Sequence, residues 1–181
     1  MKKSLLLLLI IIYWGCNQKV DQTEELKKKE QTIKKIEQKI SDFHFAYERL
    51  CNGTKMNIDS LLTTFYEPSM RYITAWAVEE PYDSMNARLK RFIPHVSAYE
   101  AKITGIEVRL YQNGAIASYL LRQSYAINNY PLEELLPTVC VLEPYGENDW
   151  RVVFLQRTTN YATMMQYVEM QQMIDTISIK K

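Results

Sequence analysis

Between residues 103 and 159 the apolar residues recur at nearly every second position, and this period constrains the fold more than any other feature of the chain. Side chains of a β-strand alternate between its two faces, so such a period predicts half-buried strands. The Asn-Gly pair at 113–114 is typical of a two-residue hairpin turn, and residues 128–134 are expected to form a loop. We therefore predict an antiparallel meander of four strands at residues 101–111, 115–128, 135–145 and 150–159.

The chain ahead of this meander is mainly helical by pattern. Apolar residues from Leu26 to Leu50 recur at steps of three and four, which predicts one helix from Glu24 to the Asn52-Gly53 pair. Its first half is charged, whereas the half from Ile40 onward is apolar enough to pack into a core. A coiled-coil dimer is the alternative, although its heptads are interrupted by Lys29.

Three shorter elements are predicted between the long helix and the meander. A helix capped by Asn57 or Asp59 ends before Pro68, and the β-branched and aromatic stretch 70–78 follows as a short strand. After Pro81 the pattern predicts a further helix, which Asp83 or Ser84 would cap and Pro94 would end.

The N-terminus has the pattern of an export signal. Lys2 and Lys3 precede ten apolar residues at 5–14, which are too few for a membrane-spanning helix of about 20 residues. Gly15 and Cys16 follow the run, and the chain then turns polar. Residues 1–15 are therefore predicted to be a signal peptide.

Gly15-Cys16 resembles the lipobox of bacterial lipoproteins. The resemblance implies cleavage before Cys16, attachment of lipid such as palmitate to Cys16, and anchoring to a membrane of the bacterial cell envelope, facing the periplasm or at the cell surface. Residues 16–32 would then be a polar tether and the charged start of the helix. Tyr13 and Trp14 are bulkier than the family's usual residues, so an ordinary secretory signal is the alternative.

Charge and composition exclude several function classes. The formal net charge is +1 and the chain has no basic cluster, so no nucleic-acid partner is expected. The chain has only two histidines, and no Cys/His spacing is typical of zinc, so neither a metal nor a cofactor is expected. Export would permit a disulfide between Cys51 and Cys140. Both cysteines lie in segments expected to be buried, where a lone Cys behaves as a small hydrophobic residue, so two free thiols are expected and the disulfide is the alternative.

The order of elements resembles the NTF2-like superfamily, and within it the small SnoaL-like or DUF4440-type domains. The stretches that carry the resemblance are residues 40–73, LYQNGAIASYLL at 110–121 and TVCVLEPYGENDWRVVFLQRTT at 138–159. It implies an α+β cone over residues 33–160, in which a bent antiparallel sheet, the four-strand meander plus a short strand, wraps over the N-terminal helices. Such a cone leaves a pocket at its open end.

Neutral polar residues of the expected strands are the candidate ligand contacts. A few placed polar groups in an apolar pocket suit a small, mostly apolar ligand. Alternatively the tyrosine rings simply fill the cone, with their hydroxyls at the rim. His44 is predicted to lie partly exposed on the helix flank, and Arg122, Arg151 and Arg157 on a solvated sheet face. The candidate contacts are Tyr72, Tyr119, Gln123, Tyr125 and Gln156.

The resemblance implies that catalytic relatives place Asp, His, Tyr or Arg in the pocket, and the closing strand here carries Phe154 where those relatives often carry His. We therefore expect a protein that binds a small ligand or a partner protein without catalysis. The alternative is a small-molecule lyase or isomerase in which His95, oriented by Asp83 or Glu80, acts as the base beside the pocket tyrosines.

Residues 161–181 are rich in methionine, a residue over-used at adaptable interfaces. We expect this segment to serve as an interaction surface, such as that of a homodimer, and packing back on its own domain is the alternative. The methionines in question are Met164, Met165, Met170 and Met173.

Overall fold

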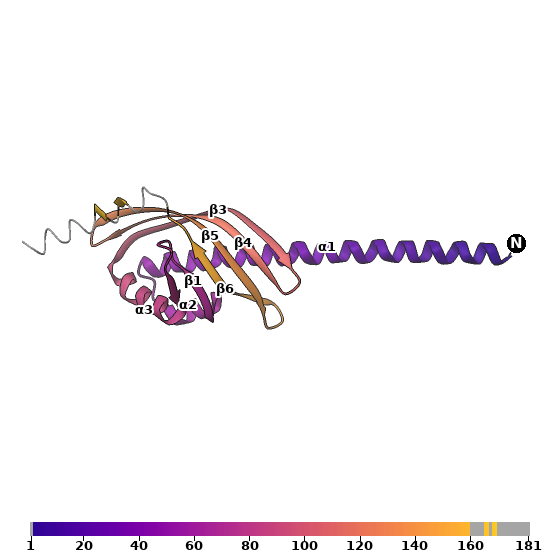
Figure 1. Cartoon of the computed structure of the whole chain (residues 1–181), viewed down its shortest axis with the longest axis horizontal. Coiled ribbons are helices and arrows are strands. Elements are labelled where there is room, and N and C mark those ends of the chain that lie inside the picture. Colours follow the sequence, from indigo (N-terminus) through magenta and orange to yellow (C-terminus); the bar gives the residue numbers. More distant parts are fainter. Residues whose placement is uncertain (1, 160–164, 167, 170–181) are drawn as a thin grey trace, which may run out of the picture. The chain divides into compact units, whose positions relative to one another are not determined.

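The structure is a computed structural model that describes the backbone of residues 2–159, 165–166 and 168–169, and the side chains from residue 22 onward within those ranges. The chain divides into two compact units, Met1–Ile36 and Glu37–Lys181. Helix α1, Lys2–Cys51, begins in the first unit and ends in the second (Figure 1).

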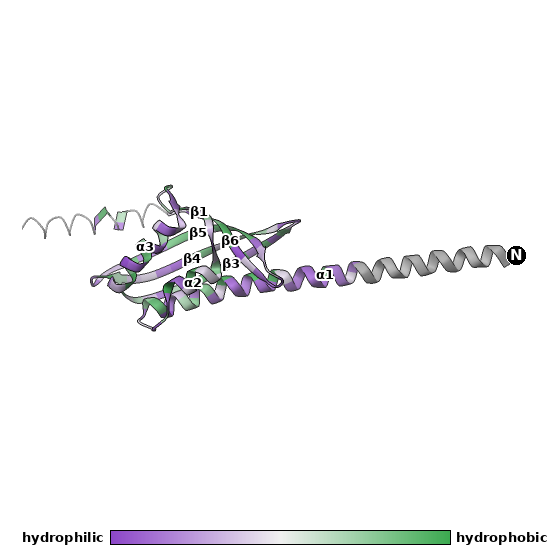
Figure 2. Cartoon of the chain, turned by 90° about the horizontal axis from the view of Figure 1, so that it is seen from below, coloured by the Kyte–Doolittle hydropathy of each residue, from purple (hydrophilic) through white to green (hydrophobic). Residues whose placement is uncertain are grey.

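The first unit consists of the beginning of α1. Residues 17–23, expected to form a polar tether ahead of the helix, lie within the helix, and this stretch contains neither Gly nor Pro. Exposed ion pairs of the predicted i,i+4 kind follow, with Lys28 3.6 Å from Glu24 and Lys29 2.7 Å from Glu25. In Figure 2 the stretch of α1 that carries these ion pairs is mostly in the purple of hydrophilic residues. None of the helices in the described part of the chain is both long and apolar enough to cross a membrane.

In the second unit, α1 ends where Gly53 takes the left-handed φ of +88°. Helix α2, Ile58–Phe65, is capped as predicted by Asn57, whose side-chain oxygen accepts from the Asp59 N–H at 2.8 Å. Helix α3, Tyr82–Phe92, has no side-chain cap, so the expected cap at Asp83 or Ser84 is wrong. The helix instead starts directly after Pro81, the last residue of a strand, and ends in the turn η1, Ile93–His95.

Six strands form one mixed sheet in the order β2-β1-β6-β5-β4-β3. The last four strands in sequence are antiparallel neighbours, which confirms the predicted meander, and β1 adds to β6 in parallel. In Figure 1 the meander strands run side by side and curve over α2 and α3. The bounds are β1 Tyr66–Ile73, β2 Glu79–Pro81, β3 Val96–Tyr111, β4 Gly114–Ile127, β5 Tyr130–Tyr145 and β6 Asp149–Arg157.

Several strand bounds differ from those predicted, because pairing with a neighbour extends them. Both β3 and β5 begin five residues earlier than the local pattern indicates, since Ile127 at the end of β4 pairs with Val96 on one side and Tyr130 on the other. The expected loop at 128–134 therefore shrinks to two residues. Conversely, the strand expected at 70–78 stops at Ile73, and a turn leads into β2.

The turns of the β3–β4 and β4–β5 hairpins use their residues differently from the prediction. Tyr111 pairs with Gly114, so the first loop is Gln112-Asn113 and the glycine belongs to β4. A Cβ on Gly114 would lie 2.9 Å from the Leu142 carbonyl oxygen, which explains the glycine by close strand approach. The pair of left-handed residues that a type I′ turn requires occurs instead at Asn128 and Asn129, with φ of 50° and 69°.

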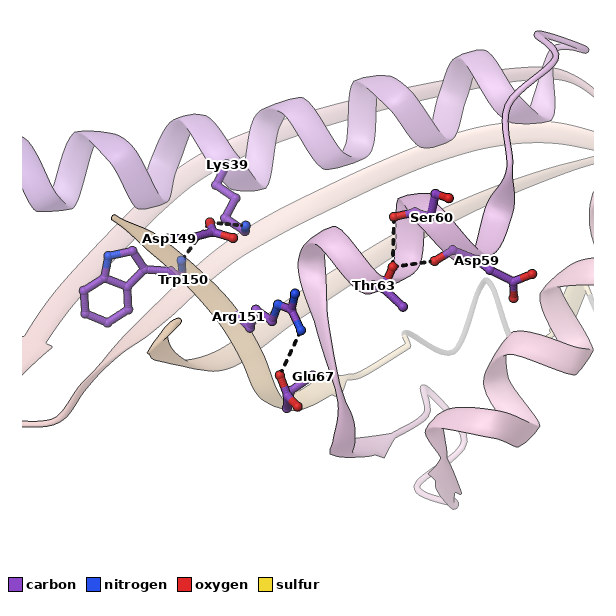
Figure 3. Close-up of polar contacts among 8 residues, drawn as sticks. All are labelled: Lys39, Asp59, Ser60, Thr63, Glu67, Asp149, Trp150 and Arg151. Atoms are coloured by element: carbon purple, nitrogen blue, oxygen red, sulfur yellow. Dashed lines mark hydrogen bonds and ion pairs between the residues drawn. The ribbon is translucent and has the colours of Figure 1, made fainter. Parts of the chain in front are cut away.

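Aromatic rings and ion pairs join the helices to the sheet within the second unit. Phe43 of α1 stacks on Phe65 of α2 with ring centroids 4.1 Å apart. At the start of β6, Lys39 of α1 contacts Asp149 at 2.5 Å, and Arg151 reaches Glu67 of β1 at 3.2 Å. Figure 3 shows both ion pairs. Together these contacts hold β6 between the end of α1 and β1.

Candidate functional site

A cavity of about 750 Å³ lies within the second unit, inside the range typical of small-molecule sites. Its walls come from the last turns of α1, the β1–β2 hairpin, α3 and the inner face of the meander. Most of the lining is aromatic or aliphatic, including Phe43, Tyr47, Phe92, Tyr125, Leu136 and Leu155.

Strand register determines which side chains of the sheet face this cavity. Leu155 of β6 is aligned with Tyr72 of β1 and with Cys140 of β5. Two residues further along β6, Arg157 is aligned with Thr138, which is in turn aligned with Tyr119 of β4. Since residues two apart in a strand share a face, Leu155 and Arg157 both point inward.

Arg157, the last residue of β6, is the charged residue of this inner row. It lines the cavity, so its predicted position on a solvated face is wrong. Its Nε is buried and has no hydrogen-bond partner in the described part of the chain. The groups that act on its charge are the phenols of Tyr72, Tyr66, Tyr119 and Tyr99.

Arg151 and Arg122 have different surroundings from Arg157. Arg151 is half-buried, contacts Glu67, and lies over the Tyr145 ring at 3.3 Å from its centroid, which is a cation–π arrangement. The prediction of a solvated position is therefore wrong for Arg151 as well. Arg122 is exposed, as predicted.

His44 is buried at 3% exposure and lines the cavity, which corrects its predicted position on a partly exposed flank. Its Nε2 is 3.0 Å from the Tyr119 hydroxyl. Burial, with a further contribution from the positive charge of Arg157, lowers the pKa of His44 to about 3. The imidazole is therefore neutral at physiological pH.

A chain of hydrogen bonds runs across the neighbouring part of the wall. The Tyr99 hydroxyl donates to the Gln123 side-chain oxygen at 2.6 Å, and the Gln123 amide donates to the carboxylate of Glu134. Asn52, just after α1, binds the Tyr99 backbone with both ends of its amide, at 2.7 and 2.9 Å. These bonds fix the orientation of the Gln123 amide in the cavity wall.

Two carboxylates on the β1–β2 hairpin also line the cavity, and each is paired with an arginine. Glu80 accepts from Arg88 of α3 at 2.8 and 2.9 Å, and Glu79 accepts from Arg71 at 2.8 Å. Their negative charges are therefore balanced locally.

The structure brings three of the five predicted ligand contacts together. Tyr72, Gln123 and Tyr125 line the cavity. Tyr119 is buried against His44, is not part of the cavity lining, and borders a separate hollow. Gln156 is exposed and borders this same hollow of about 360 Å³.

The position of Gln156 follows from an irregularity in β6. Leu142 pairs with Val152 while Val141 pairs with Phe154, so Val153 is an extra residue. Because of this bulge, every later residue of β6 points to the opposite face of the sheet, so Gln156 points outward and Arg157 inward.

The buried position of His44 could have been predicted from the sequence, since His44 is four residues from Ile40 on the buried stripe of α1.

The residues of the alternative catalytic site are not brought together. His95 and Asp83 are both exposed, and neither lines the cavity. Among the residues whose side chains are described, no hydrogen bond joins His95 to Asp83 or Glu80.

The remaining predicted features concern cysteines, metal ligands and the C-terminus. Cys51 and Cys140 are buried free thiols, and burial raises the pKa of each to about 12. No cluster of metal-ligating side chains is found within the described ranges. Most of the methionine-rich segment lies outside the described residues, apart from four positions at 165–166 and 168–169.

Comparison with known proteins returned matches of structure alone. A scan against family models found no match, and neither did a search of curated proteins. An NTF2-like protein of unknown function from Pseudomonas aeruginosa matches with a TM-score of 0.58 at 18% identity, over 70% of this chain and 98% of that one.

Two further solved structures are similar. An NTF2-like superfamily protein from Salmonella enterica has a TM-score of 0.60 at 12% identity, over 71% of this chain and 91% of that one. An NTF2-like protein from Cytophaga hutchinsonii has a TM-score of 0.53 at 11% identity, over 67% and 95%. At such identities the likeness concerns the fold.

Proposed function

This chain has the NTF2-like fold that its sequence predicted, and we propose that it is an exported, lipid-anchored protein of the bacterial cell envelope that binds a small ligand in the cavity without catalysis. The observation that carries the binding function is the cavity itself, about 750 Å³ with a mostly apolar and aromatic lining. Pockets of this size and composition are typical of small-molecule sites.

The anchoring part of the proposal rests on the sequence. Basic residues, a short apolar run and Gly15-Cys16 occur in the order that export and lipidation at Cys16 require. Lipidated Cys16 would hold the protein at the membrane.

The catalytic alternative has less support. A lyase or isomerase that used His95 would need this residue near the pocket tyrosines and a carboxylate that orients it. His95 and Asp83 are exposed and lie outside the cavity lining. Buried His44 is a poor replacement, because its pKa of about 3 makes it a weak base.

Lipidation is tested by metabolic labelling with a palmitate analogue. We expect the wild-type chain to be labelled and Cys16→Ala to remain unlabelled, because the substitution removes the thiol that carries the lipid. Cys51→Ala is the matched control and should retain the label. Equal labelling of Cys16→Ala and the wild type would contradict the anchor.

Ligand binding is tested with a neutral apolar probe, N-phenyl-1-naphthylamine, and native mass spectrometry of the full chain released from detergent micelles. Ser84 of α3 lines the cavity and is exposed, so Ser84→Trp should narrow the cavity and weaken binding about tenfold, which is a modest steric loss of about 1.4 kcal/mol. Ala87→Trp, at an exposed α3 position outside the lining, is the matched control. No binding to the wild type, or equal binding to both tryptophan variants, would contradict the proposal.

A further inference from the structure

We propose that the ligand is an organic acid, an apolar or aromatic molecule with a single carboxylate, and that this carboxylate binds the guanidinium group of Arg157. The inference rests on the proposed ligand-binding function and specifies the chemical class of the ligand.

The first argument is the unmatched charge of Arg157. Its Nε is buried without a hydrogen-bond partner, and none of the ion pairs in the described part of the chain includes this residue. A buried charge without a counter-ion is costly, and a buried donor without an acceptor adds to that cost. A ligand anion would supply both the counter-ion and the acceptor.

The second argument is that the other charged groups of the cavity are already satisfied. Glu80 is paired with Arg88, Glu79 with Arg71, and the Glu134 carboxylate accepts from Gln123. His44 is neutral. Glu134 keeps its negative charge, because the Gln123 amide that it accepts from is neutral. Arg157 is therefore the lining cation that has no ion-pair partner in the described part of the chain, and the nearby negative charges favour a monoanion over a dianionic phosphate.

The third argument concerns the phenolic hydrogen-bond donors near Arg157. Burial raises the pKa of the Tyr66 phenol, so this hydroxyl in the cavity lining stays protonated and can donate. The Tyr119 hydroxyl contacts His44 instead. A guanidinium group matches the two oxygens of a carboxylate with parallel N–H bonds. Phenolic donors beside it favour an acceptor-only group such as a carboxylate.

The fourth argument is the rest of the cavity wall, which is mostly aromatic and aliphatic. Leu155 is the inward neighbour of Arg157 on β6, and Tyr125 stacks on Tyr99 with centroids 5.7 Å apart. The rings of Phe92 and Tyr125 pack edge to face, with centroids 5.7 Å apart. Such walls suit the rings or alkyl chain of the acid, beyond its polar end.

The test compares 2-naphthoic acid with 2-naphthamide, which has the same apolar body without the charge, on the full chain by native mass spectrometry. We expect the acid to bind about 10- to 100-fold more tightly, the range of a charge-assisted hydrogen bond. Arg157→Gln should abolish this preference. Arg122→Gln, on an exposed part of β4, is the matched control and should retain it.

A second measurement does not depend on the Arg157→Gln variant. In the wild-type chain with ¹⁵N-labelled arginine, binding of the naphthoic acid should shift one buried Nε–H resonance downfield, and the amide should not. The Arg157→Lys chain, which retains a positive charge, identifies that resonance by its absence.

The outcomes separate this inference from the proposed function. If the neutral naphthylamine binds but the acid shows no advantage over the amide, the carboxylate inference is overturned and ligand binding stands. If 2-naphthyl phosphate binds more tightly than the acid, the assignment to a carboxylate is overturned. If none of these probes binds, the proposed function falls as well.

Discussion

Among the single residues, His44 has surroundings that strongly change its chemistry. The imidazole is enclosed between α1 and the sheet, next to the Tyr119 hydroxyl and close to the positive Arg157. Both burial and this like charge oppose protonation, which is why its pKa falls from 6.5 to about 3. Folding therefore depends on His44 remaining neutral.

Because of His44, the free energy of unfolding of the domain should decrease as the pH is lowered. Below pH 6.5 the unfolded chain takes up a proton at this residue and the folded chain does not, down to about pH 3, so acid favours unfolding. His44 should contribute up to about 1.4 kcal/mol per pH unit to this loss. Urea unfolding at pH 7, 5 and 4 should show a shallower loss for His44→Gln than for the wild type.

His95→Gln is the matched control, because His95 is exposed. Its unfolding free energy should follow that of the wild type across the same pH values. An unchanged pH dependence in His44→Gln would contradict a neutral buried imidazole.

At the scale of secondary-structure elements, the two-residue turns decide how the long strands align. Asn128 and Asn129 both have positive φ, and they join β4 to β5 so that Ile127 pairs with Tyr130. Asparagine tolerates this left-handed conformation, whereas a residue such as alanine adopts it at a cost. The register that follows places Gln123 beside Glu134 and Tyr119 beside Thr138.

Substitution of Asn129 should reveal this strain. Asn129→Ala should lower the free energy of unfolding by about 1 kcal/mol, because an L-residue with a Cβ is strained at positive φ. Asn129→Gly is the matched control and should keep or raise stability, since Asn-Gly is the preferred type I′ pair. Denaturant unfolding measures the stability of both variants. An equal loss of unfolding free energy in the two would contradict the strain argument, because it would mean that the asparagine side chain, and not the backbone conformation, stabilises the turn.

At the scale of the whole domain, the sheet and helices bury both described thiols. Cys51 ends α1 and is 4% exposed, and Cys140 of β5 is fully buried. Their raised pKa values of about 12 leave almost no thiolate at neutral pH. Modification of either thiol therefore requires the domain to open.

Thiol labelling should consequently follow global unfolding. In the Cys16→Ser chain, N-ethylmaleimide at pH 7 should react with neither remaining cysteine in the native state and with both in urea. The labelling midpoint should match the midpoint measured by circular dichroism. Rapid native labelling would contradict the burial, and failure to label in urea without reductant would indicate a disulfide.

Much of the secondary structure could be predicted because it depends on local periodicity and capping. Alternation specified the four meander strands, and Asn57 specified the start of α2. The resemblance to the NTF2-like superfamily then indicated how these elements pack. Three residues that line the cavity, Tyr72, Gln123 and Tyr125, could also be selected from the strand patterns.

The sequence by itself determined the order and type of most elements, since hydrophobic spacing and turn residues act over a few neighbouring positions. Only the tertiary structure decided which side chains meet in the cavity. A bulge at Val153 exchanged Gln156 for Arg157 on the inner face, and the curved sheet closed over His44. Both outcomes depend on pairing between strands far apart in sequence, where one extra residue reverses a face.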